Sequence, residues 1–186
     1  MASQLASAPF AIKEEPLPKV AAWTEDAAQV ASLKTYERIG LWLHPEDLVV
    51  EQGELAGLKI QAVNASWPTG LSTRAGWSEK VSGWTQAALR DGATRASDHS
   101  GAEVASDETS DLATSLVEWA KQNQLQAVVA YHPFVGPWLT EALSIEAAFT
   151  SAGVRLIWRR RAWDAAHFPH ATRGYFPFWE RIKSAG

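Results

Sequence analysis

The sequence predicts an α/β fold built on an open, mainly parallel sheet with helices on both faces. Short apolar segments alternate with amphipathic ones along the 186-residue chain, and the connections between them are short. This order favours parallel strands joined by right-handed crossovers. The run A-V-V-A at 127–130 is apolar throughout, as expected of a central parallel strand covered on both faces. The predicted architecture is therefore Rossmann-like.

The first half of the chain supplies two strands and one helix. The segment 38–43 (R-I-G-L-W-L) is a short apolar strand, and 57–63 alternates apolar and polar residues as a half-buried strand does. Residues 77–96 predict a helix with one aromatic face, which is expected to pack in the core. Its residues at helical spacing are Trp77, Val81, Trp84 and Ala88. The polar, glycine-containing stretch 97–107 predicts a loop.

The second half repeats this alternation. A helix is expected where apolar residues recur at helical spacing, at Leu112, Leu116, Trp119 and Ala120. A strand follows at 126–131, and then a helix over 138–149. Gly153 ends that helix, because glycine tolerates the positive φ found just past a helix end. Residues 154–158 predict the last strand, and 177–184 predict a short closing helix.

The first 36 residues differ in composition from the rest. They contain three prolines, Pro9, Pro16 and Pro18, and show little hydrophobic periodicity. We expect a flexible tail or linker over 1–36 and a single α/β domain over 37–186.

Composition restricts the class of protein. The net charge of −4 argues against direct DNA binding, which depends on neutralising many phosphates. With no cysteine, disulfides and thiolate metal sites are excluded, and a cytoplasmic location is expected. No apolar run approaches the roughly 20 residues of a membrane span, and the N-terminus does not resemble a secretion signal.

No catalytic constellation is recognisable. The sequence contains neither of the glycine-rich phosphate-binding loops, no G-x-S-x-G nucleophile elbow and no cysteine nucleophile. His167 and His170 have the spacing of metal ligands on a helix, but Pro169 between them disfavours a continuous helix. We therefore assign no catalytic residue and no metal ligand.

Two loops that follow predicted strands are candidate ligand sites, because open α/β sheets bind ligands at the carboxyl ends of their strands. The candidate residues are His44 and Glu46 after the first strand, and Tyr131, His132, Phe134 and Gly136 after the central one. The central loop also leads into a helix N-terminus, which attracts anions. The alternative is that prolines and a glycine only build a tight turn.

Aromatic and basic residues near the C-terminus form a candidate partner surface. These residues are Trp158, Arg160, Trp163 and Trp179. Guanidinium and aromatic groups together are typical of docking or base-stacking surfaces. The alternative is internal stacking of arginine on aromatic rings, which stabilises a fold without a partner.

Several segments together resemble the N-terminal α/β domain of DNA photolyases and cryptochromes. D-L-A-T-S-L-V-E-W-A-K-Q-N-Q-L-Q-A-V-V-A-Y-H-P-F, then G-V-R-L-I-W, then G-Y-F-P-F-W-E-R-I follow that domain's order, and R-I-G-L-W-L-H-P-E-D-L resembles its first strand. The first loop departs from the family, because it carries His44-Pro45-Glu46 where an arginine is usual. No segment resembles the family's helical FAD domain. The resemblance therefore implies FAD only through a separate domain or a partner chain.

Three functions follow as expectations. The first is a photolyase-related domain that is not catalytic alone. It could bind an antenna chromophore or nucleotide-like ligand at the strand ends and work with a flavin-binding photolyase-like domain or chain in DNA repair or light sensing. The second is a protein-interaction module without a ligand. The third is a stand-alone nucleotide-binding enzyme, which the missing phosphate loops disfavour.

Overall fold

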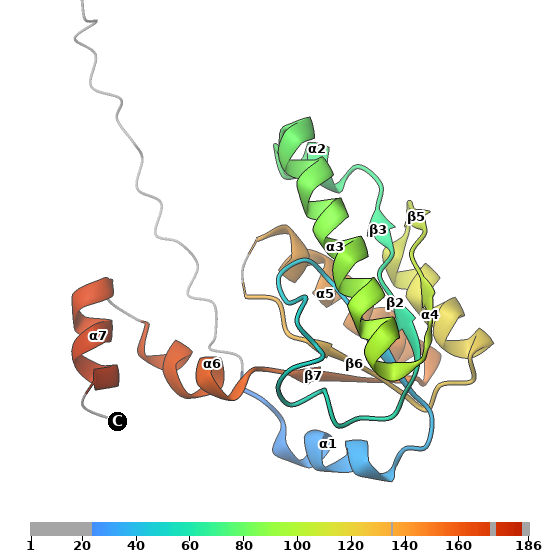
Figure 1. Ribbon diagram of the computed structural model, residues 1–186, viewed down its shortest axis with the longest axis horizontal. Coiled ribbons are helices and arrows are strands. Elements are labelled where there is room, and N and C mark those ends of the chain that lie inside the picture. The colour runs from blue at the N-terminus through green and yellow to red at the C-terminus, as the bar shows by residue number, and fades with distance from the viewer. Residues whose placement is uncertain (1–23, 135, 172–173, 184–186) are drawn as a thin grey trace, which may run out of the picture.

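The computed structural model describes residues 24–134, 136–171 and 174–183 of the chain (Figure 1). The helices are α1 (Ala27–Ser32), α2 (Leu71–Arg74), α3 (Glu79–Ser100), α4 (Leu112–Gln122), α5 (Pro137–Ala152), α6 (Ala162–His167) and α7 (Tyr175–Lys183), with 3-10 turns η1 (Leu33–Thr35) and η2 (Phe168–His170). The strands are β1 (Ile39–Trp42), β2 (Ile60–Asn64), β3 (Trp67–Pro68), β4 (Glu103–Ala105), β5 (Glu108–Thr109), β6 (Ala127–Tyr131) and β7 (Arg155–Arg159).

Five strands form one parallel sheet in the order β4-β2-β1-β6-β7. The register places Leu41 of β1 beside Val63 of β2 and Val129 of β6. A second, two-stranded sheet pairs β3 with β5 in parallel. The predicted α/β class and open, Rossmann-like parallel sheet are thus confirmed.

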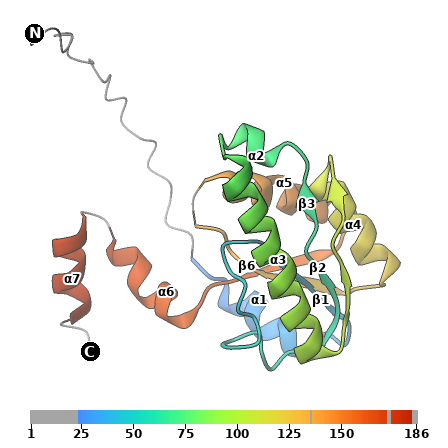
Figure 2. The ribbon, with the colours of Figure 1, turned by 45° about the horizontal axis from the view of Figure 1, so that its top comes forward.

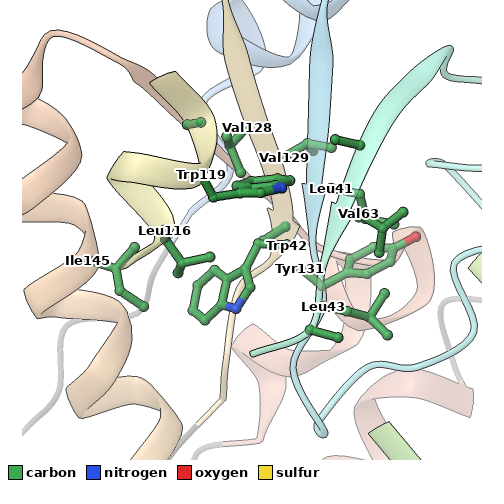
Figure 3. Packing of buried hydrophobic residues seen from close by; sticks show 14 of the residues in the cluster. Leu41, Trp42, Leu43, Val63, Leu116, Trp119, Val128, Val129, Tyr131 and Ile145 are labelled. Carbon is green, nitrogen blue, oxygen red and sulfur yellow. The ribbon is translucent and has the colours of Figure 1, made fainter. Parts of the chain in front are cut away.

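Helices cover both faces of the five-stranded sheet. α3 packs on β2 and β4, whereas α4 and α5 pack against each other and α5 also contacts β7. Figure 3 shows the two apolar layers, with Trp42, Leu116 and Ile145 on one side and Leu41, Val63 and Leu43 on the other. Successive residues of a strand face opposite sides, so the buried strand β1 contributes to both layers. All five residues of β6 are buried, as its apolar run predicts.

Gly40 shows how closely the α4 layer approaches the sheet. A Cβ added at Gly40 would lie 2.4 Å from Leu125 Cδ1 and 2.6 Å from Trp119 Cη2. Real Cβ atoms essentially never have such short contacts, so the indole of Trp119 requires glycine at this point of β1.

The structure differs from the expected loose tail over its last part. Asp26 Oδ1 accepts hydrogen bonds from the backbone N–H groups of Ala28 (2.9 Å) and Gln29 (3.1 Å) and so caps α1. Leu33 is 2% exposed and belongs to the core. Residues 24–36 are therefore folded on the domain, and residues 1–23 lie outside the described residues.

Two further local expectations are corrected. The stretch 97–107 is not a loop throughout, because α3 continues to Ser100 and residues 103–105 form the edge strand β4 beside β2. The buried face of α3 is also not the aromatic one: Trp84 is 73% exposed. The helix instead buries a stripe of small and medium residues, namely Thr85, Leu89, Gly92, Ala93 and Ala96.

Candidate functional site

The two loops predicted as ligand sites lie on either side of the point where the strand order reverses. From β1 the sheet continues to β2 and β4 in one direction and to β6 and β7 in the other. β1 leads into the loop of His44 and Glu46, and β6 leads into the loop of His132 and Phe134. Ligands of open α/β folds bind at this kind of position. The candidate residues are thus brought together at one edge of the sheet.

His44 joins the two loops inside the protein. The residue is 1% exposed, and its Nε2 lies 2.6 Å from the backbone oxygen of Tyr131. Because a carbonyl oxygen only accepts, Nε2 carries the proton, and Nδ1 accepts from the Glu46 N–H at 3.3 Å. Burial lowers the pKa of His44. The imidazole is therefore a neutral bridge between the strand ends.

Glu46 makes a second connection between the loops. Its Oε2 accepts a hydrogen bond of 2.9 Å from the backbone N–H of Phe134. Burial raises the pKa of the Glu46 carboxyl, and the bond from Phe134 partly opposes that shift. Glu46, a candidate ligand contact, therefore holds the second loop against the first.

Arg161, just after β7, fixes the rest of the first loop. Its Nη2 and Nε donate to the two carboxylate oxygens of Asp47 at 2.5 Å and 2.8 Å. Nη2 also donates to the backbone oxygen of Val49 at 2.7 Å. The guanidinium lies 4.7 Å from the centre of the Tyr131 ring. Bonding to Asp47 raises the pKa of Arg161, so the pair stays charged.

Gly53 lets the same loop pass close to Arg161. It has φ +96°, and a Cβ added there would lie 3.1 Å from Arg161 Nη1 and 3.4 Å from the Tyr131 hydroxyl oxygen. Both the backbone conformation and the space favour glycine. We call residues 44–54 the closing loop, because they lie against the ends of β6 and β7 and are held there by Arg161.

Tyr131 and Glu54 complete this closure. The Tyr131 hydroxyl donates to Glu54 Oε2 at 3.1 Å, and Glu54 Oε1 accepts from the Ala162 N–H at 2.7 Å. Burial raises the pKa of Tyr131, so the phenol keeps its proton. Burial alone would also raise the pKa of Glu54, but the hydrogen bonds it accepts outweigh burial and lower it. The phenol and the carboxylate therefore bind each other.

The remaining two candidates of the central loop have different surroundings. His132 is half-buried and lies edge-on to Trp158, with ring centres 5.3 Å apart. Burial lowers the pKa of His132 to about 4. Gly136 caps α5 with φ +88°, and a Cβ added there would have no atom within 4 Å. Gly136 is thus required by backbone conformation and not by close approach of another group.

Arg159 and Arg160 also bind within the fold. Arg159 Nε donates to Glu25 Oε2 at 2.8 Å. The guanidinium of Arg160 lies between two rings, 5.3 Å from the centre of Phe134 and 4.7 Å from that of Phe168. Cation–π contacts of this kind stabilise a fold where the cation is desolvated. The basic run after β7 therefore attaches neighbouring segments to the sheet.

Only two of the four residues of the candidate partner surface lie on the surface. Trp158 and Arg160 are 7% and 5% exposed, so both side chains are largely buried within the fold. Trp158 faces the α5 layer, where its ring lies 5.6 Å from that of Trp42. Trp163 and Trp179 are 60% and 46% exposed and do lie on the surface.

The two exposed tryptophans belong to one projecting segment. Figures 1 and 2 both show α6 and α7 extending away from the five-stranded sheet. We call α6, η2 and α7 the C-terminal arm. Its large exposed aromatic residues are Trp163 (60%), Phe168 (38%), Tyr175 (65%), Phe176 (78%) and Trp179 (46%). Exposed apolar side chains gathered on one segment are a common feature of interaction sites.

Three residues of the closure were not recognised from the sequence. Asp47, Glu54 and Arg161 hold the closing loop, but each finds its partner 77 to 114 residues away along the chain. The positions of Asp47 and Arg161 weakly indicate a role at the site, because Asp47 directly follows Glu46 and Arg161 directly follows Arg160. Glu54 lies within a polar stretch and has no such indication.

The candidate residues of the closure bind partners within the fold. His44, Glu46 and Tyr131 each form a hydrogen bond within the fold. Within residues 24–134, 136–171 and 174–183, no three histidine, aspartate or glutamate side chains are grouped so that they could hold a metal ion.

Comparison with protein-family models, curated proteins and solved structures found no significant match. The photolyase and cryptochrome resemblance therefore stays a prediction from the sequence. In the part of the chain that the structure describes, every helix is too short or too polar to cross a membrane.

Proposed function

We propose that this protein is an α/β interaction module that binds a partner protein through its C-terminal arm. The observation that carries the proposal is the arm's row of exposed aromatic rings, of which Phe176 is 78% exposed. Aromatic anchors dominate the binding energy of protein interfaces.

The form of the arm supports the proposal. The arm is joined to the sheet near its start, where the Ala162 N–H binds Glu54 and Arg160 stacks on Phe168. Beyond η2, α7 extends from the rest of the molecule (Figure 2). The rings of Tyr175 and Trp179 are stacked on α7 with centres 6.4 Å apart. Rings ordered before binding lose less conformational entropy when a partner covers them.

The resemblance suggests what the partner is. G-Y-F-P-F-W-E-R-I, which forms most of α7, is similar to the segment that closes the photolyase α/β domain before the helical flavin domain. We therefore propose a helical flavin-binding domain of photolyase type, on a separate chain or region, as the arm's partner. FAD would then be held by that partner.

Binding to a photolyase-type flavin domain, measured by size-exclusion chromatography with light scattering and by titration calorimetry, tests the proposal. A triple variant with Tyr175→Ser, Phe176→Ser and Trp179→Ser is expected to weaken binding at least tenfold. Trp84→Ser is the control, because Trp84 is a tryptophan on α3 that is 73% exposed, more than the 46% of Trp179. Equal binding by the triple variant and the wild type, or no binding by the wild type, would reject the arm as the docking surface.

A chromophore or nucleotide-like ligand at the strand ends is a second candidate. The position of the closing loop at the reversal of strand order favours it. Such a ligand would have to displace the closing loop, since His44, Glu46 and Arg161 hold that loop on the sheet. Absorbance above 350 nm in the purified protein, with a copurifying compound in its mass spectrum, would support this candidate.

A further inference from the structure

A groove runs along the free edge of the sheet, away from both the closing loop and the arm. Its volume is about 410 Å³, and it lies between α1, the end of α5 and β7. Leu156 and Trp158 of β7 line it, together with Thr24, Asp26, Glu146 and Arg155. β7 is the last strand on this side, so among the described residues it has β6 as its only strand neighbour.

Two residues of β7 direct their backbone groups into this groove. The backbone oxygen of Arg159 accepts from the His132 N–H at 2.8 Å, so Arg159 faces the β6 side. The next residue, Arg160, donates its N–H outward to Glu25 Oε2 at 3.0 Å. Backbone groups alternate in direction along a strand of a parallel ladder. Leu156 and Trp158 therefore face outward like Arg160, and an edge of this kind is a template for another strand.

One residue of the groove, Trp158, has a buried indole N–H. It is 7% exposed, and its indole N–H has no hydrogen-bond partner in the part of the chain that the structure describes.

The charges of the groove differ between its two ends. Arg155 stands at the start of β7. Gly153 and Val154 connect α5 to β7. Glu146 lies about 10 Å back along α5 from Gly153, and Trp158 lies about 13 Å along β7 from Val154. Glu146 is therefore about level with Trp158. Asp26 follows Glu25, the residue bound to the Arg160 N–H. The groove is therefore basic at the Arg155 end and acidic at the Trp158 end.

We propose that this groove binds an extended peptide segment of a partner protein, which pairs with β7 as a sixth strand. The segment runs antiparallel to β7, since antiparallel pairing is the more stable form. It carries a basic residue near its N-terminus, opposite Asp26 and Glu146, and an acidic residue near its C-terminus, opposite Arg155. Between them, apolar side chains contact Leu156 and Trp158. Main-chain bonds supply affinity in this mode, and the side chains supply specificity.

The test uses the full-length chain and the peptide Ac-Ser-Lys-Val-Thr-Val-Glu-Ser-NH2. Amide hydrogen exchange and chemical shifts of Leu156 and Trp158 are followed by NMR. The peptide is expected to slow exchange at both amides at least tenfold and to shift the Trp158 indole signal. Glu146→Lys is expected to weaken binding at least fivefold, whereas the control Glu118→Lys, an exposed acid on α4, leaves it unchanged.

Two further peptides make the test decisive. Exchanging the Lys and Glu of the peptide should weaken binding at least fivefold, and replacing its central Thr by Pro should abolish it. Equal binding of all three peptides, or none at millimolar concentration, overturns the proposal. Slow exchange of Leu156 and Trp158 before any peptide is added also overturns it, because the edge would then already be paired within the protein.

Discussion

Arg161→Ala is expected to destabilise the fold by about 2–4 kcal/mol and to release the closing loop. The guanidinium contacts four acceptors on this loop: both carboxylate oxygens of Asp47 and the backbone oxygens of Val49 and Gln52. In the described part of the chain, no hydrogen bond from another side chain to these four oxygen atoms is observed. After truncation the Asp47 carboxylate stays largely buried but has lost the guanidinium that binds it.

The magnitude follows from the burial of the pair. The side chains of Arg161 and Asp47 are 28% and 11% exposed. Breaking a fully buried ion pair costs about 3–5 kcal/mol, whereas an exposed pair contributes about 0–1 kcal/mol. A pair with a bidentate contact and this partial exposure lies between the two limits, nearer the buried one. Arg161→Lys keeps the charge but loses the two-pronged geometry, so about half the cost is expected.

Urea unfolding followed by tryptophan fluorescence measures these differences. Arg74→Ala is the matched control, because Arg74 also binds a glutamate at 2.7 Å but is 57% exposed; its cost should stay below about 1 kcal/mol. A double-mutant cycle with Asp47→Ala should give a coupling energy of at least about 1 kcal/mol. A cost for Arg161→Ala no larger than for Arg74→Ala would refute the view that Arg161 closes the strand ends.

Two other perturbations have clear expected signs. Acidification should destabilise the protein, because the fold lowers the pKa of His44, and of His132 to about 4, below the value of about 6.5 in the unfolded chain. The unfolded state then binds more protons between these values, so stability is complete above about pH 6.5 and falls as the pH drops toward 4. The raised pKa of Glu46 opposes this in part. Urea midpoints at pH 7, 5.5 and 4.5 should fall, and less steeply in His44→Gln; a flat profile would contradict the assignment of His44 as a neutral bridge. Gly40→Ala should cost about 1–3 kcal/mol by overpacking against Trp119, and an unchanged urea midpoint would contradict the packing of α4 on β1.

Much of the fold could be predicted because its signals are local. The apolar run at 127–130 and the glycine after α5 each depend on a few adjacent residues, and both are found where expected. The prediction that the aromatic face of α3 is buried was wrong, because sequence periodicity gives weight to large apolar residues. This helix packs closely instead: a Cβ added at Gly92 would lie 3.1 Å from Leu43 and Leu48. Small residues at the contact allow that approach, and tryptophan would prevent it.

The site could be predicted only as a location. Strand ends follow from the order of elements, so the sequence placed His44 and Tyr131 near one another. Whether such residues face a ligand or each other depends on contacts across the chain, such as Arg161 with Asp47 over 114 residues. Nothing in the local sequence specifies that pairing, because loop geometry and the twist of the sheet decide it.

Three consecutive arginines, Arg159, Arg160 and Arg161, attach three different segments of the chain near the end of β7. Arg159 binds the segment before α1, and Arg161 binds the closing loop. Arg160 binds the start of the arm between two aromatic rings. Alternate residues of an extended chain point to opposite sides, so one short run can attach segments on both faces of the sheet. The positive charge of this run is thereby bound within the fold, whereas aromatic side chains of the arm such as Trp163 and Phe176 stay exposed. Contacts within the fold thus cover the strand ends and leave the aromatic rings of the arm exposed, which is the arrangement on which the proposed docking of a partner depends.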